Sequence, residues 1–331
     1  MNRPRCTDTD YIDFLVATPR AVSCVEAARV QPRCANAPAH DAFTRLLHRL
    51  EPDPAALWEE VAPLVDRTKG ILVGDDSTLD KPYARKMDLV TRHWSGKHHA
   101  VVEGINLITL VWTDGDRIIP IDYRIYDKAH DGITKNEHFL AMLLTAQQRG
   151  FTPECVLFDS WYASVDNLRL IRDLGWRWLT RLKANRRVSI DYAPKRALDG
   201  WPIAETGTAV HLEAYGLIRV FRVVAIDGDT EYWATDDLAM EELGRLKYAE
   251  MAWGIEVYHR ALKQECGVER AQVRAARAQR NHIGMAIRAF VRLEWHRVRT
   301  GISWGMAKEG IIRHAIRSYL ARPWYRLPAT A

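Results

Sequence analysis

The order of strand-like and helix-like segments between residues 71 and 183 is the feature that most constrains the fold of this chain. Three apolar, strand-like segments come first, and then helix and strand alternate twice. In chain order the segments are ILVGDD (from 71), GINLITLVW (104–112), RIIPIDYRIY (117–126), a helix-like segment (136–149), ECVLFDSWY (154–162), NLRLIRDLG (167–175) and WRWLTRLK (176–183). An antiparallel start that changes to alternating helices and strands predicts an α/β fold with a mixed sheet and flanking helices.

The regions on either side of this segment have different patterns. Residues 1–68 have helical spacing of apolar residues, with Ser23 as an expected N-cap, and they form either a helix-turn-helix that reads DNA or an ordinary helical cap. Short β-like segments separated by Gly and Asp follow the alternating part, and helices return after them. We therefore predict a helical N-terminal domain (1–68), the first part of a core (69–185), a β-rich insertion (186–237), a core helix and a basic helix (238–300) and a helical tail (301–331).

Length and composition limit the class of protein. A chain of 331 residues allows two or three domains with a sizeable core. Its five cysteines are scattered and lack a CxxC pair, which argues against a disulfide framework or a zinc site and favours a reducing cytoplasm. The longest apolar run is far shorter than the ~20 residues that span a bilayer, so we expect a soluble protein without a membrane partner.

Two strand-like segments end at carboxylates. ILVGDD ends at the adjacent residues Asp75 and Asp76, and ECVLFDSWY contains Asp159 directly after its apolar run. Acids at the tips of neighbouring strands can share a hard divalent cation, and two such cations about 4 Å apart can catalyse phosphoryl transfer. The alternative for each acid taken singly is a turn residue or a helix cap.

A third acid is available on a later helix. In WGIEVYHRALKQ (253–264), Glu256, Arg260 and Lys263 lie at positions i, i+4 and i+7, on one helical face. One interpretation is a carboxylate ligand beside two phosphate contacts. The other is an ordinary i,i+4 ion pair on an exposed helix.

Basic residues concentrate after this glutamate. Between Glu256 and Arg299 there are ten Lys and Arg against four acids, although the whole chain has a net charge of only +5. Arg270, Arg274, Arg277 and Arg280 recur every three or four residues and predict a basic helical ridge. Further basic clusters are TRLKANRR (180–187), which contains Arg181 and Lys183, and GKHH (96–99). Three such clusters around the acids favour a nucleic-acid substrate.

The motifs VGDDSTL, VLFDSWY and IEVYHRALKQ together resemble the Asp, Asp, Glu signature of the DDE transposases of bacterial insertion sequences, and Lys263 occupies the place of the lysine seven residues after the glutamate. The resemblance extends over most of the chain. It implies a ribonuclease-H-like core interrupted by a β-rich insertion. The separation of 97 positions from Asp159 to Glu256 fits such an insertion. The pattern departs from relatives at two places, where an arginine and a tyrosine are replaced by Ala252 and Ala249.

The resemblance implies a set of roles. Asp75, Asp159 and Glu256 would be the catalytic ligands of two Mg²⁺ or Mn²⁺ ions. Asp75 is favoured over Asp76, the alternative ligand, because such enzymes commonly have Ser or Thr two residues after the first Asp and an apolar residue four after it, here Ser77 and Leu79. The residues expected to contact DNA are Lys263, Arg260, Arg181, Lys183, Arg270, Arg274 and Arg277.

The expected partners are the DNA of the transposon ends and of the target, bound by a homodimer in a synaptic complex within a bacterial cytoplasm, at the nucleoid. Two other functions remain open at this point. The first is a ribonuclease-H-like nuclease or resolvase, and the second is a DNA-binding repressor without catalytic activity.

Overall fold

The computed structural model describes residues 5–19, 22–32, 34, 36–95, 99–225 and 228–323. The chain divides into two compact units. A helical unit contains Met1–Pro52, Lys86–Asp88 and Arg260–Ala331, and a sheet unit contains Asp53–Arg85 and Leu89–His259.

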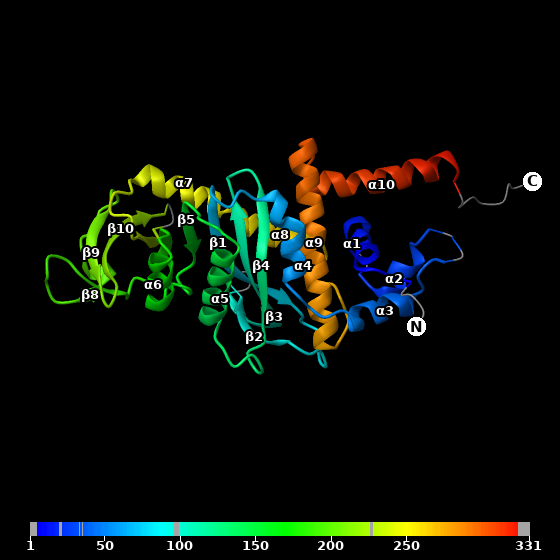
Figure 1. Cartoon of the computed structure of the whole chain (residues 1–331), viewed down its shortest axis with the longest axis horizontal. Coiled ribbons are helices and arrows are strands. Elements are labelled where there is room, and N and C mark those ends of the chain that lie inside the picture. The colour runs from blue at the N-terminus through cyan, green and yellow to red at the C-terminus, as the bar shows by residue number, and fades with distance from the viewer. Residues whose placement is uncertain are drawn as a thin grey trace, which may run out of the picture. The chain divides into compact units, whose positions relative to one another are not determined.

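The described strands form one mixed sheet in the sheet unit (Figure 1). Its strand order is β2-β3-β1-β5-β6-β11-β10-β9-β7-β8, and β4 also pairs with β3. The strands are β1 (Ile71–Asp80), β2 (Thr91–Ser95), β3 (Ala100–Thr113), β4 (Ile118–Tyr126), β5 (Cys155–Phe158), β6 (Trp178–Leu182), β7 (Arg187–Ser189), β8 (Arg196–Ala197), β9 (Thr208–Leu212), β10 (Gly216–Val224) and β11 (Thr230–Thr235).

The helices begin and end at residues that suit those places. Thr134 and Glu137 form a capping box at the start of α5, and Ser164 caps α6. The helices are α1 (Asp8–Ala17), α2 (Cys24–Arg29), α3 (His40–Arg49), α4 (Ala55–Val61), α5 (Lys135–Gln148), α6 (Val165–Asp173), α7 (Glu242–Ala252), α8 (Gly254–Gln264), α9 (Ala276–Thr300) and α10 (Trp304–Ala321), with short 3₁₀ turns η1 (Ala62–Leu64) and η2 (Leu198–Gly200).

Strand pairing confirms the predicted mixed α/β class. β1, β3 and β4 form an antiparallel meander, whereas β1, β5 and β6 run parallel. The predicted β-rich part is antiparallel within itself, and β11 pairs with β6, so this part extends the same sheet. The four boundaries between the five predicted parts stay a prediction.

Opposite faces of the sheet contact different helices. The carboxylate of Asp76 accepts a hydrogen bond from Lys135 at the start of α5, whereas Asp75 lies 3.7 Å from His259 of α8. Because successive side chains of a strand point to opposite faces, α5 covers one face and the first turns of α8 cover the other.

The helical unit has its own core, built by α1, α3, α9 and α10. Buried polar groups from the later helices complete the ends of the earlier ones. Asn281 donates hydrogen bonds to the carbonyls of Leu47 and Leu50 at the end of α3. The buried Lys308 ammonium donates to the carbonyl of Thr18, just after α1. These contacts satisfy carbonyl groups that a helix end leaves without intrahelical partners.

The predicted basic helical ridge is wrong for its first two arginines. α8 ends at Gln264 and α9 begins at Ala276, so Arg270 and Arg274 lie in an irregular connection. Gly267, in the connection that follows α8, has a left-handed φ of 63°, which does not continue a helix. Asp88 accepts a hydrogen bond from the backbone N–H of Ala276 and so defines the new start.

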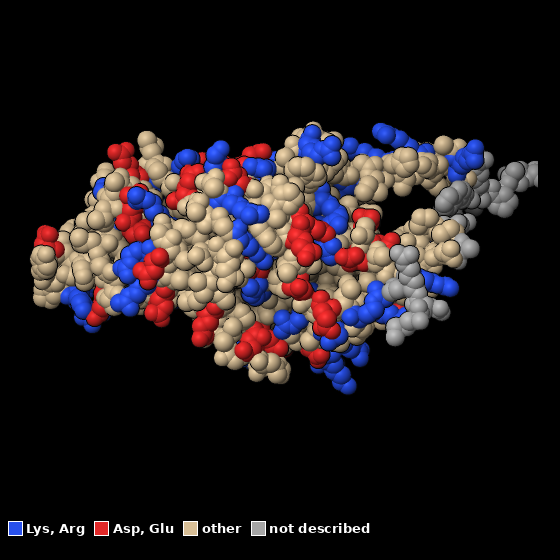
Figure 2. Space-filling model, in the orientation of Figure 1, with Lys and Arg blue, Asp and Glu red and all other residues tan. Residues whose placement is uncertain are grey.

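Several smaller expectations can be compared with the structure. The tail is helical up to Ala321, and residues 324–331 lie outside the described part, as do residues 96–98 of the GKHH cluster. All five cysteines are free thiols. None of the described helices is both long enough and apolar enough to cross a membrane. On the face of the sheet unit seen in Figure 2, basic and acidic residues are interspersed.

Candidate active site

Asp75 and Asp159 follow equivalent positions of two neighbouring strands. β1 and β5 are parallel, and their register pairs Gly74 with Phe158. The next residue of each segment is an aspartate. Parallel pairing therefore places the two acids at neighbouring positions, Asp159 directly after the end of β5 and Asp75 within β1. The expectation that the first strand ends at Asp75 and Asp76 is wrong, because β1 continues to Asp80 as a partner of β3.

The side chains of β1 alternate between two environments. A Cβ atom added at Gly74 would lie only 2.2 Å from Cε2 of Phe139, a fully buried ring on α5. The same face of the strand carries Asp76, beside Lys135 of α5. Asp75 points to the other face, toward α8. The close approach of α5 requires glycine at position 74, and alternation then separates the two adjacent carboxylates.

Replacing Gly74 with Ala is expected to lower the free energy of unfolding by about 2 kcal/mol, because Phe139 is packed and cannot move away without disturbing the core. Urea unfolding followed by circular dichroism measures this change. Gly244→Ala on α7 is the matched control, since a Cβ atom added there would lie at an ordinary 3.6 Å from its nearest neighbour, Cγ of Met240. We expect this control to be neutral or slightly stabilising. Equal unfolding midpoints for the two variants would contradict the packing argument.

The carboxylate of Asp76 is held by three donors. Lys135 Nζ lies 2.8 Å from Oδ2, Asn106 Nδ2 donates to the same oxygen at 2.5 Å, and the Tyr162 hydroxyl donates to Oδ1 at 2.8 Å. Burial alone would raise the pKa of Asp76, but Lys135 and these hydrogen bonds outweigh burial and lower it. Tyr162 lies three residues after Asp159, so this network links β1 to the segment that carries the second acid.

Asp75, Asp159 and Glu256 line one cavity of about 260 Å³ in the sheet unit, which we call the acidic cavity. They come from β1, from the end of β5 and from the first turn of α8. Other lining residues are Arg181 and Trp233 from β6 and β11, and Ala249, Ala252 and Trp253 from α7 and the α7–α8 junction. The two alanines noted as departures from related transposases thus border the same cavity as the three acids.

The cavity concentrates negative charge. Burial raises the pKa of Asp75 well above its usual value, and repulsion from Asp76, Asp159 and Glu256 adds to this effect. The pKa of Asp159 is also raised, mainly by burial and with a contribution from Asp76, although hydrogen bonds from the backbone N–H groups of Trp161 and Tyr162 oppose the shift. A cation bound between these groups would relieve the repulsion.

The type of donor in this cavity fits a hard divalent cation, because carboxylate oxygens are the ligands that Mg²⁺ and Mn²⁺ prefer. In the described part of the chain, no three or more His, Cys, Asp or Glu side chains form a ready-made metal cluster. The fit therefore depends on donor chemistry and on the mutual repulsion of the acids.

A family model described as DDE superfamily endonuclease matches residues 5–207, which is more than half of the chain. The chain belongs to the DDE endonuclease superfamily. Asp75 and Asp159 lie within the matched residues, whereas Glu256 of this DDE endonuclease lies beyond them and joins the other two acids through the fold. Members of this superfamily generally use divalent metal ions. No curated protein matched the chain.

Two solved structures similar to this chain are both of transposases. The cryo-EM structure of the piggyBac transposase synaptic complex with hairpin DNA matches with a TM-score of 0.52 and 12% sequence identity, over 100% of this chain and 78% of that chain. The Drosophila P element transposase strand transfer complex matches with a TM-score of 0.30 and 9% identity, over 98% and 88% of the two chains. The first likeness supports the ribonuclease-H-like architecture.

The residues predicted to contact DNA lie in several environments. Arg181 lines the acidic cavity and forms an ion pair with Glu231 at 2.6 Å, while Lys183 is exposed at the end of β6. In the helical unit, Arg260 and Arg274 are exposed. Lys263 forms an ion pair with Glu269, Arg277 forms one with Glu51, and Arg270 donates a hydrogen bond to the carbonyl of Pro19. Their role in DNA binding stays a prediction.

Sequence reasoning missed two residues near the acids. His259 is buried one helical turn after Glu256, with Nδ1 3.7 Å from Oδ2 of Asp75. Its position three residues after Glu256, on the same face of the predicted helix, could have indicated that it lies near the acids. Lys135 neutralises Asp76 from α5, and nothing in the local sequence around Asp76 indicates that contact.

Proposed function

We propose that this DDE endonuclease is a transposase that cleaves DNA at the ends of an insertion sequence and transfers the freed strand into target DNA. The observation that supports this proposal most strongly is the position of Asp75, Asp159 and Glu256 around one cavity. Membership of the DDE superfamily and the fold shared with a transposase add to it.

The proposed reaction is in-line attack on phosphorus. A water oxygen forms a new bond to the phosphorus, the P–O3′ bond breaks, and a proton reaches the leaving oxygen to give a free 3′-hydroxyl. That hydroxyl then attacks a target phosphodiester in the same way, and a 3′-oxygen of the target leaves. The number of phosphodiester bonds is unchanged in the second step.

The chain's own residues would bind and orient the reacting groups. Asp75, Asp159 and Glu256 would hold two Mg²⁺ or Mn²⁺ ions, whose chemistry in such sites is activation of the attacking oxygen and stabilisation of the leaving one. Arg181 would contact a DNA phosphate from the rim, where Glu231 restrains its guanidinium. His259 would restrain the carboxylate of Asp75 from behind.

The remaining parts of the proposal concern assembly and origin. We infer a homodimer in a synaptic complex, a bacterial insertion sequence as the source, and action in the cytoplasm at the nucleoid. The basic residues of the helical unit would bind the transposon ends, and the division at residues 68, 185, 237 and 300 would separate the parts of the enzyme.

The decisive assay uses the full chain, a duplex made from the DNA that flanks its coding sequence, and a supercoiled target plasmid. We expect Mg²⁺-dependent nicking at the element ends, followed by covalent joining of the labelled strand to the plasmid. EDTA should prevent both steps without preventing binding of the duplex.

The other outcomes separate the alternatives. Metal-dependent cleavage without joined product would favour a ribonuclease-H-like nuclease or resolvase. Binding of the flanking DNA with no cleavage under any metal condition would favour a non-catalytic repressor. Either result overturns the transposase proposal.

A further inference from the structure

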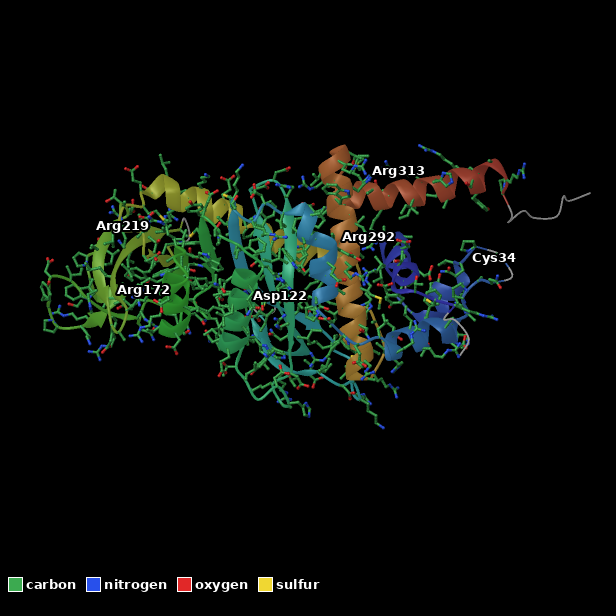
Figure 3. All side chains as sticks on the ribbon, viewed as in Figure 1. Cys34, Asp122, Arg172, Arg219, Arg292 and Arg313 are labelled. Carbon is green, nitrogen blue, oxygen red and sulfur yellow. The ribbon has the colours of Figure 1, made fainter. Side chains whose placement is uncertain are left out.

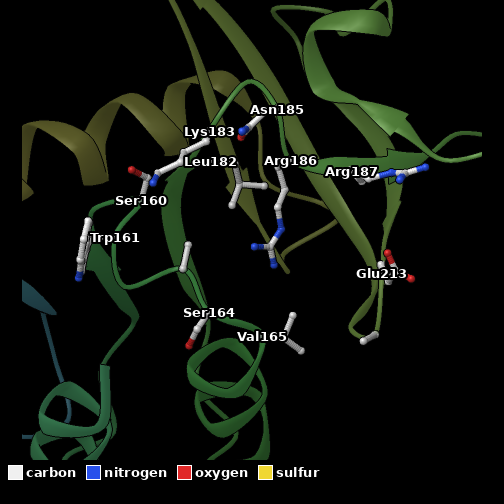
Figure 4. A pocket seen from close by; sticks show the side chains of 12 residues that line it. Ser160, Trp161, Ser164, Val165, Leu182, Lys183, Asn185, Arg186, Arg187 and Glu213 are labelled. Carbon is white, nitrogen blue, oxygen red and sulfur yellow. The ribbon is translucent and has the colours of Figure 1, made fainter. Parts of the chain in front are cut away.

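A second cavity of the sheet unit lies beside the loop that follows Asp159 (Figure 4). Its volume is about 530 Å³, within the range of about 300–1,000 Å³ that is typical of small-molecule sites. Its walls come from the loop after β5 and the start of α6, from the end of β6 through the start of β7, and from the turn between β9 and β10. The lining residues are Ser160, Trp161, Ala163, Ser164, Val165, Leu182, Lys183, Asn185, Arg186, Arg187, Glu213 and Ala214. β6 contributes to both cavities, through Arg181 to the acidic cavity and through Leu182 to this one, but the two sets of lining residues do not overlap. We call this second cavity the basic cavity.

The centre of the basic cavity contains a half-buried guanidinium. The Arg186 side chain extends inward between Leu182 and Arg187, toward Ser164 and Val165 (Figure 4). Within the described part of the chain, its guanidinium forms no hydrogen bond or ion pair. Burial lowers the pKa of Arg186. A cation that is partly removed from water and lacks a partner is poorly stabilised until an anion binds beside it.

A second cation is positioned on the adjacent wall. Lys183 Nζ lies 5.6 Å from the centre of the Trp161 ring, and Lys135 Nζ lies 5.7 Å from the same ring. These cation–π contacts favour a position of the Lys183 ammonium near the cavity rim. The single acid of the lining, Glu213, is neutralised by Lys195 at 2.5 Å. The basic cavity therefore has a net positive charge.

The walls of the basic cavity are held in place before any ligand binds. Ser164 caps α6, so the positive end of that helix lies at the cavity wall. Arg172, labelled in Figure 3, extends from α6 and donates a hydrogen bond to the carbonyl of Tyr215 at 3.1 Å. The Tyr215 hydroxyl accepts one from Trp178 at 2.8 Å. These contacts fix the β9–β10 turn against α6, which reduces the ordering cost of binding.

We propose that the basic cavity binds a nucleotide phosphate, with Arg186 and Lys183 as its two cationic contacts. Guanidinium and ammonium groups are the usual donors to phosphate oxygens, and the cavity has room for the attached sugar and base. The phosphate could belong to a DNA strand or to a free nucleotide. The DNA source rests on the proposed function, because Ser160 and Trp161 directly follow Asp159 and would bring that strand past the acidic cavity.

The test measures binding of a fluorescein-labelled oligothymidylate to the full chain in EDTA, by fluorescence anisotropy at several salt concentrations. Arg186→Gln is expected to weaken binding about tenfold, the effect of losing one charge-assisted hydrogen-bonded contact. The slope of log affinity against log salt should decrease by about one. Arg222→Gln, an exposed arginine of β10 outside this lining, is the charge-matched control and should change neither quantity.

Competition distinguishes the two sources of the phosphate. Displacement of the oligonucleotide by dTMP from the wild type, and not from Arg186→Gln, would identify a site for free nucleotides. Displacement only by unlabelled oligonucleotide would identify a DNA phosphate. Equal affinity and equal salt slope of Arg186→Gln and Arg222→Gln would overturn the proposal.

A second variant and the assay conditions keep the result independent of folding and of catalysis. If Arg186→Gln unfolds, Lys183→Gln, at an exposed position, tests the same site and should weaken binding in the same way. Because the assay contains EDTA and intact strands, it needs no cleavage. Failure of the cleavage assay with a retained Arg186 effect would therefore reject the transposase and keep the nucleotide site.

Discussion

Replacing Glu256 with Gln or Asp159 with Asn is expected to reduce Mg²⁺-dependent cleavage of the flanking DNA by about a thousandfold or more. Each substitution keeps the size of the side chain and removes one of three carboxylates around the acidic cavity. Charge stabilisation by a correctly held metal contributes several kcal/mol to a phosphoryl-transfer transition state, and each 1.36 kcal/mol corresponds to about a tenfold change in rate. Single-turnover cleavage of end-labelled duplex measures the loss.

Binding and cleavage should respond differently. Affinity for the uncut duplex in EDTA should stay the same or increase slightly, because each variant removes a negative charge beside the expected path of DNA. Glu250→Gln and Asp173→Asn are matched controls, since both acids are exposed and neither lines the acidic cavity. We expect these controls to cleave normally. Cleavage by Glu256→Gln or Asp159→Asn at a rate close to that of the controls would remove the assignment of the catalytic acids.

Most of the element order, and the place of Asp159 at a strand tip, could be predicted because both depend on local signals. The apolar run before Asp159 marks the tip of β5, whereas the expectation that a strand ends at Asp75 and Asp76 is wrong, because β1 continues to Asp80 and pairs with β3 over that length. Parallel pairing of β1 with β5 still brings Asp75 close to Asp159. The strand-like period of the β-rich part was also readable. The pairing of this β-rich part with the core sheet could not be predicted, because β11 and β6 are about fifty residues apart in the chain.

The environments of Asp75 and Asp76 illustrate what local sequence cannot decide. Alternation predicts that the two side chains point to opposite faces, but it does not say which face lies beside Glu256. That depends on Phe139 and Lys135, which α5 brings against β1 from a distant part of the chain. The resemblance to DDE transposases favoured Asp75, and the structure adds a physical reason why Asp76 has a different environment.

For the basic segment after α8, the sequence pattern predicted a helix that the structure does not have. Arginine spacing of three and four residues is typical of one helical face, yet Arg270 and Arg274 precede α9. The start of that helix is defined by Asp88, which bonds to the N–H of Ala276 across a long separation in sequence. Periodicity of charged residues is weak evidence because, unlike apolar periodicity, it is not tied to burial.

The two adjacent aspartates are expected to have opposite effects on folding in the absence of metal. Asp76→Asn should lower the free energy of unfolding by about 3 kcal/mol, because it leaves the largely buried Lys135 ammonium without its counter-charge. Asp75→Asn should instead raise it at neutral pH. The Asp75 carboxylate is partly buried among other acids, and removing its charge relieves that repulsion. Urea unfolding of both variants in EDTA measures whether each substitution raises or lowers the free energy of unfolding.

The pH dependence follows from the directions of the two pKa shifts. The pKa of Asp76 is lower in the folded state, so its stabilisation is present above the unfolded value of about 3.9 and is lost as the pH falls through the folded value. The pKa of Asp75 is higher in the folded state, so its penalty is absent below about pH 3.9 and grows as the pH rises toward the folded value. The advantage of Asp75→Asn over the wild type should therefore disappear in acid. A site that is destabilised by its own charge until a cation binds is consistent with selection for function at the expense of stability, and equal effects of both variants at neutral pH would contradict it.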